Sequence, residues 1–171
     1  GTHKFHRYPG KFIPHIPRWA FGRYLPVSNS RSSRVVVDPF CGSGTTLVEA
    51  AAMGVKSYGL DVDPIARLVS RVKTRPVDRK RLLKVVADVR QKVKRRTSAS
   101  FKPEIPTLLH WFSPEAVTDL GVIRGVIEDY RRDVDIYEFL LVCFAAIIRR
   151  ASNADNQTQK TYVSHTKPKT P

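Results

Sequence analysis

Two glycines, Gly42 and Gly44, lie between a short apolar run and a stretch of helix-forming residues, in residues 38–46, DPFCGSGTT. Glycine permits a tight turn and a close approach of the backbone to a ligand, and the start of a following helix presents unpaired backbone N–H groups. The spacing matches neither G-x-G-x-x-G nor G-x-x-x-x-G-K-[ST], so a loop that grips phosphate is not favoured. The segment instead predicts a loop that lies against a nucleotide-like ligand without gripping a phosphate group.

An acidic residue, Asp61, follows the next apolar segment and stands 23 residues after Asp38. An acid at the end of the second strand of a doubly wound sheet can accept hydrogen bonds from ribose hydroxyls, which indicates an adenosine-containing cofactor. Asp61 could instead cap the helix that begins near Pro64, although Asp63 is better placed for capping. The two roles of Asp61 can coexist.

A strand, a loop and a helix are needed to position these residues, and they follow one another in the sequence. Residues 34–38 form a β-branched run typical of a fully buried parallel strand, and helix formers over 45–53 end at Gly54. A second strand is expected over 55–61, followed by a helix from Pro64 to about Val72. This βαβα order predicts parallel pairing and a right-handed crossover.

The second half of the sequence predicts helices. Residues 79–95 form a basic helix with an apolar stripe, and two prolines within 97–106 end it. Further helices are expected over about 114–132, where Ser113 precedes a proline, and over about 135–151, where apolar residues on nearly every side predict a helix buried almost all round. Residues 152–171 are polar and read as a loop or tail, and with no initial methionine the chain is expected to be a piece of a longer protein.

The charge indicates a polyanionic partner. Of 171 residues, 30 are Lys or Arg and 15 are Asp or Glu, which gives a formal charge of +15 and a pI near 10.3. Residues 1–37 contain no acid, and residues 65–102 hold fourteen cations against two acids. A basic helix face is also common as a merely solvated face, so this alternative stays open for residues 65–102.

The sequence disfavours a membrane protein, a disulfide-rich protein and a metal-binding protein. The sequence has no run of 18 apolar residues and no charged-then-apolar leader, so we expect a cytoplasmic protein without a membrane partner, with one core for a chain of this length. Cys41 and Cys143 are too few for a disulfide framework and too isolated for a zinc site, and the histidines show no ligand spacing. No metal is expected.

Two segments resemble a known family. Residues 38–46 closely resemble the D-P-F-x-G-S-G-T-T cofactor motif of the amino (N4-cytosine and N6-adenine) DNA methyltransferases. Upstream, residues 6–14, HRYPGKFIP, resemble the same family's element of the type F-P-A-K or Y-P-G-K followed by an apolar residue and proline. Without this likeness, residues 6–14 would read as a proline-rich surface segment.

The resemblance implies an α/β, Rossmann-like S-adenosylmethionine-dependent methyltransferase fold, present in part and followed by a helical C-terminal part. Residues 1–75 would hold the cofactor motifs and the start of the sheet, 76–151 a helical continuation or insertion, and 152–171 the tail. The implied cofactor is S-adenosyl-L-methionine and the implied partner is DNA, whose target base is flipped out of the duplex.

The resemblance also implies roles for individual residues. Lys11, Phe12 and Pro14 would help to enclose the methionine end of the cofactor, Asp61 would hold the ribose and Val62 would pack on the adenine. The loop would lie against the cofactor through Asp38, Pro39, Phe40, Gly42, Gly44 and Thr45.

The family's catalytic motif, D/N/S-P-P-Y/F/W, is not found in the sequence. Residues 63–65 and 113–115 lack the second proline and the aromatic residue, so no catalytic residue is assigned. We expect a downstream segment or a second chain to carry this motif. The alternatives are a catalytically inactive methyltransferase-like module that binds nucleic acid, and an RNA methyltransferase, because the loop indicates the cofactor rather than the substrate.

Overall fold

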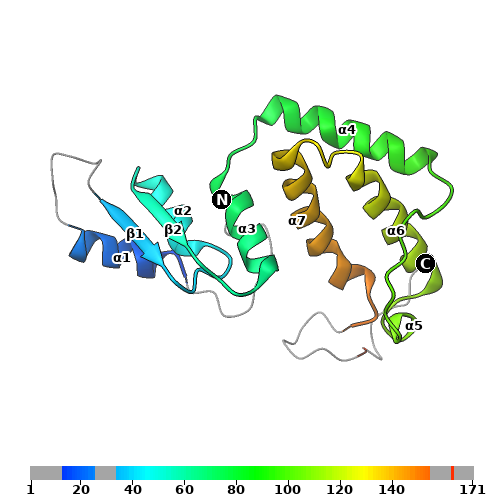
Figure 1. Ribbon diagram of the computed structural model, residues 1–171, viewed down its shortest axis with the longest axis horizontal. Coiled ribbons are helices and arrows are strands. Elements are labelled where there is room, and N and C mark those ends of the chain that lie inside the picture. Colours follow the sequence, from blue (N-terminus) through cyan, green and yellow to red (C-terminus); the bar gives the residue numbers. More distant parts are fainter. Residues whose placement is uncertain (1–12, 26–33, 155–162, 164–171) are drawn as a thin grey trace. The chain divides into compact units, whose positions relative to one another are not determined.

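Two short parallel strands form the sheet of the first part of the chain. The computed structural model describes residues 13–25, 34–154 and 163, which divide into two units, Gly1–Pro76 and Val77–Pro171 (Figure 1). In the first unit, β1 (Val35–Asp38) pairs in parallel with β2 (Lys56–Gly59), with Asp38 opposite Gly59. The helix α2 (Thr45–Ala52) makes the crossover between them, and α3 (Pro64–Thr74) follows β2. The predicted βαβα order is therefore confirmed, although both strands are shorter than predicted.

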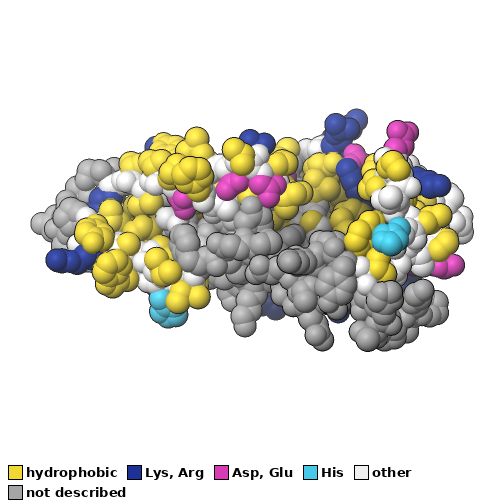
Figure 2. Space-filling model, turned by 90° about the horizontal axis from the view of Figure 1, so that it is seen from below, with side chains coloured by type: hydrophobic (Ala, Val, Ile, Leu, Met, Phe, Trp, Pro, Cys, Tyr) yellow, Lys and Arg dark blue, Asp and Glu magenta, His cyan; other side chains and the backbone are white. Residues whose placement is uncertain are grey.

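One face of the sheet is covered by helices. A helix that the sequence did not predict, α1 (His15–Tyr24), supplies Phe21 to a cluster with Ala50 of α2 and Val55, and Val36 of β1 packs against this cluster. The alternate residues of β1 are exposed, Val35 by 49% and Val37 by 60%. Figure 2 accordingly shows hydrophobic side chains at the surface of this unit. The prediction of a fully buried strand is therefore wrong, because the described helices of this unit pack on one face only.

The second unit consists of helices among its described residues. These are α4 (Arg79–Arg95), the short α5 (Leu108–Trp111), α6 (Pro114–Glu128) and α7 (Val134–Ala151). Three of them begin at a side-chain cap, because Asp78, Ser113 and Asp133 each accept a hydrogen bond from a backbone N–H of the first turn. The predicted bounds of α4 are confirmed, whereas α6 ends four residues earlier than predicted.

The second unit has its own apolar cluster, in place of the single core expected from the length of the chain. Ile127, Ile136 and Leu140 form its centre, and the apolar stripe of α4, including Leu82 and Val89, packs against it. In α7 only Ile136, Leu140 and Val142 are buried, and most of the other residues are half-buried. The prediction that this helix is buried almost all round is therefore wrong for the described part of the unit, in which α7 packs on α6 along one side.

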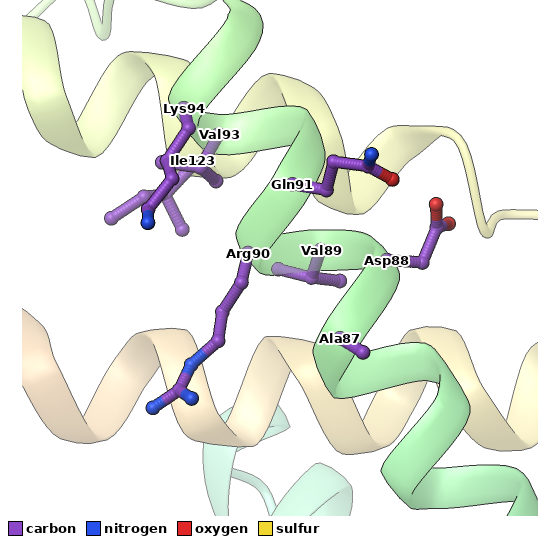
Figure 3. A pocket seen from close by; sticks show the side chains of 8 residues that line it. All are labelled: Ala87, Asp88, Val89, Arg90, Gln91, Val93, Lys94 and Ile123. Atoms are coloured by element: carbon purple, nitrogen blue, oxygen red, sulfur yellow. The ribbon is translucent and has the colours of Figure 1, made fainter.

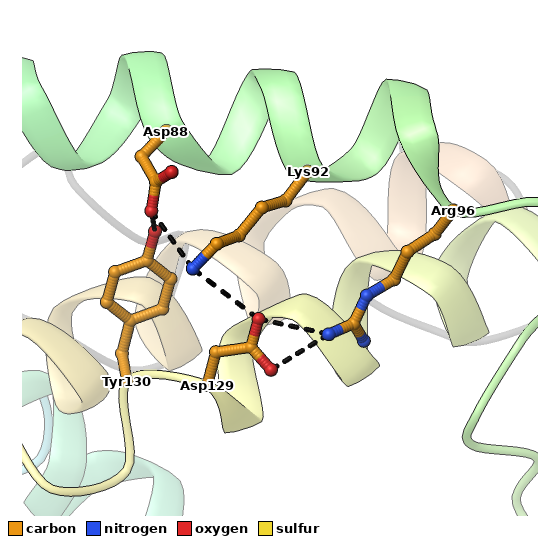
Figure 4. Close-up of polar contacts among 5 residues, drawn as sticks. All are labelled: Asp88, Lys92, Arg96, Asp129 and Tyr130. Carbon is orange, nitrogen blue, oxygen red and sulfur yellow. Dashed lines mark hydrogen bonds and ion pairs between the residues drawn. The ribbon is translucent and has the colours of Figure 1, made fainter.

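A polar network joins α4 to the end of α6 (Figure 4). Lys92 Nζ lies 3.0 Å from Asp88 Oδ2 and 3.5 Å from Asp129 Oδ2, and Arg96 Nη2 donates to Asp129 Oδ1 at 2.8 Å. The hydroxyl of Tyr130 donates a hydrogen bond to the Asp88 carboxylate. Burial of the hydroxyl, and then this hydrogen bond, raise the pKa of Tyr130 to about 12. Ion pairs that are a third to a half exposed contribute about 0 to 1 kcal/mol each, so the network orients α4 more than it stabilises the unit.

None of the described helices is both long enough and apolar enough to cross a membrane.

Substitution of Gly121 should destabilise the second unit. A Cβ on this α6 residue would lie 2.4 Å from the backbone oxygen of Phe101 and 2.8 Å from Ala99 Cβ. The overlap should outweigh the gain in helix propensity, so we expect Gly121→Ala to lower the free energy of unfolding by about 1 to 3 kcal/mol. In the control Gly22→Ala, no described atom lies within 4 Å of the new Cβ, and stability should be unchanged or higher by up to about 1 kcal/mol. Urea denaturation measures the unfolding free energy of both variants. Equal effects of the two substitutions would contradict the close packing of Gly121 on residues 99–101.

Acid should weaken the α4–α6 contact through Asp88. The hydrogen bond from Tyr130, and then Lys92, hold the pKa of the Asp88 carboxyl below its ordinary value of 3.8. A lowered folded-state pKa means that the stabilisation is present above the unfolded-state pKa and is lost as the pH falls through the folded-state value. The difference in unfolding free energy between the native chain and Asp88→Asn should therefore be constant near neutral pH and shrink below about pH 4. The control is Asp119→Asn, at an exposed position of α6. If the unfolding free energy of this control differed from that of the native chain with the same pH dependence, the effect could not be assigned to Asp88.

Candidate cofactor site

The candidate site lies at the edge of the sheet where both strands end. Because β1 and β2 are parallel and Asp38 is opposite Gly59, the loop of residues 39–44 and the turn of residues 60–63 leave the sheet side by side. In open α/β sheets, ligands bind outside the carboxyl ends of the strands. The sheet register thus brings the glycine loop and Asp61 to one edge.

Backbone hydrogen bonds hold the glycine loop against the end of β2. Leu60 N donates to Asp38 O at 2.9 Å, and Cys41 N donates to Leu60 O at 2.9 Å. Within the loop, Gly44 N donates to Cys41 O at 2.8 Å. The loop is therefore an ordered extension of the strand pair up to the first turn of α2.

The Asp61 carboxylate joins the glycine loop to the turn before α3. Its Oδ2 accepts a hydrogen bond from Gly42 N at 2.8 Å, and its Oδ1 accepts one from Asp63 N at 2.9 Å. Asp63 in turn caps α3 by accepting from Ile65 N at 2.8 Å, which confirms the interpretation of Asp63 as the cap. Each carboxylate oxygen keeps a second lone pair, so Asp61 can still accept a hydrogen bond from a ligand hydroxyl.

Both glycines of the loop have backbone angles that favour glycine. Gly42 has φ 49° and Gly44 has φ 77°. A Cβ on Gly44 would also lie 2.7 Å from Ser70 Cβ of α3. Gly44 therefore allows α3 to pack closely on the loop, so a larger residue there would disturb the local fold as well as any ligand.

Around this loop, the residues predicted to contact a cofactor differ in exposure. Phe40 and Val62 are 86% and 94% exposed, which leaves two apolar side chains open to a ligand at this edge. Thr45 is buried, so contact with a ligand would come from its backbone at the start of α2, where no side chain caps the helix. Asp38 accepts a hydrogen bond from Phe40 N at 3.1 Å, which makes it a residue that shapes the loop.

The upstream element is only partly described. Lys11 and Phe12 lie outside the described residues. Pro14 is half-buried at the N-terminus of α1. The helix α1 is held to α2 by Arg18, whose Nη2 donates to Oε1 of the buried Glu49 at 3.2 Å.

Lys73 is a residue of this site that sequence reasoning missed. Its side chain is buried, and Nζ donates to the backbone oxygen of Ser43 at 2.8 Å. The helix α3 therefore holds the loop one residue beyond Gly42, whose N–H donates to Asp61. The available signal was the helical spacing of small and apolar residues on α3, which places a lysine on the buried stripe. This stripe consists of Ala66, Val69, Ser70 and Lys73.

The described side chains at this edge offer neither an activated thiol nor a metal-binding cluster. Cys41 is buried, and burial raises the pKa of its thiol, so the thiol stays protonated near neutral pH and is a poor nucleophile. The described residues contain no group of three His, Cys, Asp or Glu side chains that could hold a metal ion. Two exposed apolar side chains, a carboxylate with remaining lone pairs and the start of a helix lie together at this edge.

Comparison with known proteins links this segment to methyltransferases. Residues 24–105, which include the glycine loop and Asp61, match the family model described as UPF0020: RMKL-like, methyltransferase domain. No solved structure matches the chain.

Three curated relatives illustrate the similarity. The type II methyltransferase M.MvaI of Kocuria varians is 28% identical over 94% of this chain, and the type II methyltransferase M.MjaII of Methanocaldococcus jannaschii is 38% identical over 54%. A tRNA (guanine(10)-N2)-dimethyltransferase of Methanothermobacter thermautotrophicus is 38% identical over 33% of this chain. The aligned part makes up 37%, 17% and 16% of these three relatives. The chain thus resembles a methyltransferase in the segment that forms the candidate site, and it spans little more than a third of the length of the first relative.

Proposed function

We propose that this chain binds S-adenosylmethionine at the carboxyl edge of β1 and β2 and forms the cofactor-binding part of a DNA methyltransferase with a Rossmann-like fold. The target would be an exocyclic amino group, cytosine N4 or adenine N6. The observation that carries the proposal is the bond of the Asp61 carboxylate to Gly42 N, within the segment that matches a methyltransferase domain. It brings a ribose acceptor and a glycine loop together.

Each part of the edge has a proposed role in binding. The loop backbone from Gly42 to Thr45 would lie along the cofactor, and Asp61 would accept hydrogen bonds from the ribose. Phe40 and Val62, both exposed, would flank the adenine. Lys11 and Phe12 are proposed, from the family resemblance alone, to enclose the methionine end. The bound cofactor would supply the methyl group, and this chain would orient it.

Methyl transfer is proposed to need a further segment or a second chain. The sequence contains no D/N/S-P-P-aromatic motif, whose polar residue and carbonyl would accept hydrogen bonds from the target amino group. Residues that bind and orient the methyl donor accelerate methyl transfer only when the acceptor base is held beside the donor.

RNA is the second candidate substrate. Three relatives are tRNA (guanine(10)-N2)-dimethyltransferases, and the N2 of guanine in this name is also an exocyclic amino nitrogen. These relatives align with a third of this chain or less, whereas M.MvaI aligns with 94%. The longer alignment and the two sequence motifs favour DNA.

A binding cycle tests the ribose contact of Asp61 apart from its structural role. Calorimetry would measure the native chain and Asp61→Asn with S-adenosylmethionine and with an analogue that lacks both ribose hydroxyls. In the native chain the analogue should bind about 10- to 100-fold more weakly, because hydrogen bonds to a charged group contribute about 1.5 to 3 kcal/mol. In Asp61→Asn, whose amide is a weaker acceptor, the analogue should lose much less.

Equal losses in the two proteins would mean that Asp61 only shapes the loop. Absence of S-adenosylmethionine binding by the native, folded chain would contradict the proposed function itself.

Removal of the Lys73 ammonium should loosen the glycine loop. Lys73→Met keeps an unbranched side chain but leaves Ser43 O without this donor, so we expect about tenfold weaker S-adenosylmethionine binding. Arg67→Met, on an exposed position of the same helix, removes an equal charge and should change affinity by less than about twofold. Equal effects of the two variants would point to general electrostatics instead of a hold on the loop.

A further inference from the structure

The cations of α4 fall into two groups that differ in their partners. Arg81 pairs with Asp133, Lys92 with Asp88 and Asp129, and Arg96, which follows the helix, with Asp129. Six other cations have no acidic partner among the described residues of the chain, and all six are exposed. These six, called here the α4 cation face, are Arg79, Lys80, Lys84, Arg90, Lys94 and Arg95.

The two groups occupy different sides of the helix. At about 100° per residue, the α4 cation face covers an arc of about 160°, whereas Arg81, Lys92 and the acid Asp88 follow between about 180° and 220°. The apolar stripe that packs on the cluster of Ile127 and Ile136 occupies the remaining side. The other residues within the arc are uncharged, namely Leu83, Ala87 and Gln91. One side of α4 thus carries positive charge without any acid.

Two residues of the cation face, Arg90 and Lys94, line an open hollow, which Asp88 also lines. A pocket of about 1030 Å³ lies along the second half of α4 and reaches Ile123 of α6. Figure 3 shows Arg90 and Lys94 extending on the same side of the helix, and Asp88 extending on another side. The long side chains of the cation face can therefore reach a partner without first breaking an ion pair of α4.

We propose that the α4 cation face binds the phosphate backbone of double-stranded DNA. A face that was merely solvated would be expected to mix both signs of charge. Among the described residues, however, the acids that pair with α4 cations, Asp88, Asp129 and Asp133, do so outside the arc of the cation face. The choice of DNA over other polyanions rests on the proposed function; the binding itself depends on neither cofactor nor methyl transfer.

The dimensions of the helix match this partner. Arg79 and Arg95 are separated by about 24 Å along the axis at 1.5 Å per residue. A duplex of that length carries about seven phosphates per strand. The cation face can therefore contact several phosphates at once, and such contacts release counterions, so affinity should depend steeply on salt.

Charge removal on this face tests the proposal. The variant Lys84→Gln/Arg90→Gln/Lys94→Gln would be compared with the control Arg23→Gln/Lys102→Gln/Arg132→Gln, which removes the same charge at exposed positions off α4. Fluorescence anisotropy with a 24-base-pair duplex between 50 and 200 mM salt gives the affinity and its salt slope. We expect the α4 variant to bind at least tenfold more weakly at the lowest salt, with a log–log slope smaller by about 2 to 3, close to 0.9 per lost contact. The control should keep a slope within about 1 of the native value.

Three outcomes would overturn the assignment. Equal losses in the two variants would show attraction by net charge alone, and an unchanged α4 variant would show that the face does not bind. Tighter binding to heparin or to anionic vesicles than to the duplex, with the same dependence on α4, would give the face another partner. Thermal melts confirm folding of both variants. S-adenosylmethionine affinity, measured in parallel, separates the two proposals, because its absence contradicts the proposed function while leaving DNA binding by α4 standing.

Discussion

The candidate site depends on one carboxylate that serves two backbone turns. A glycine loop and a tight turn expose N–H groups that neither the sheet nor the helices can satisfy, and such groups need an acceptor. Asp61 accepts from Gly42 in one turn and from Asp63 in the other, so it connects the ends of β1 and β2 beyond the last strand pair. The parallel register makes this connection available, because it brings both turns to the same edge.

A second contact constrains the same loop from α3. The Lys73 ammonium binds the Ser43 carbonyl, and the missing Cβ of Gly44 lets Ser70 approach the loop closely. Burial of an ammonium is unfavourable unless it is well bonded, and the hydrogen bond to Ser43 offsets part of that cost. A loop fixed from two sides needs little reordering when a ligand arrives, and preorganisation of this kind raises affinity.

The elements that bear the site could be read from the sequence, whereas their tertiary partners could not. Strand, loop and helix were predicted correctly because β-branched residues, glycines and a proline mark them locally. The bonds of Asp61 to Gly42 and of Lys73 to Ser43 join residues 19 and 30 positions apart, and nothing in the local pattern specifies such pairs. The exposure of Val35 and Val37, and the merely partial burial of most of α7, were mispredicted for a related reason. Apolar composition shows that a face can be buried, but the packing of neighbouring elements decides whether it is.

The same reasoning applies to α4, whose sequence is compatible with either a solvated or a binding face. Tertiary pairing separates the two alternatives. Asp129 and Asp133 lie beyond α6 in the sequence, yet the α4 cations with which they pair in the described part of the chain lie outside the cation face. The charge left over is therefore concentrated on one side by the fold. In the proposed function this assigns different tasks to the two units: the first orients a methyl donor through backbone and one carboxylate, and the second attracts the polyanion.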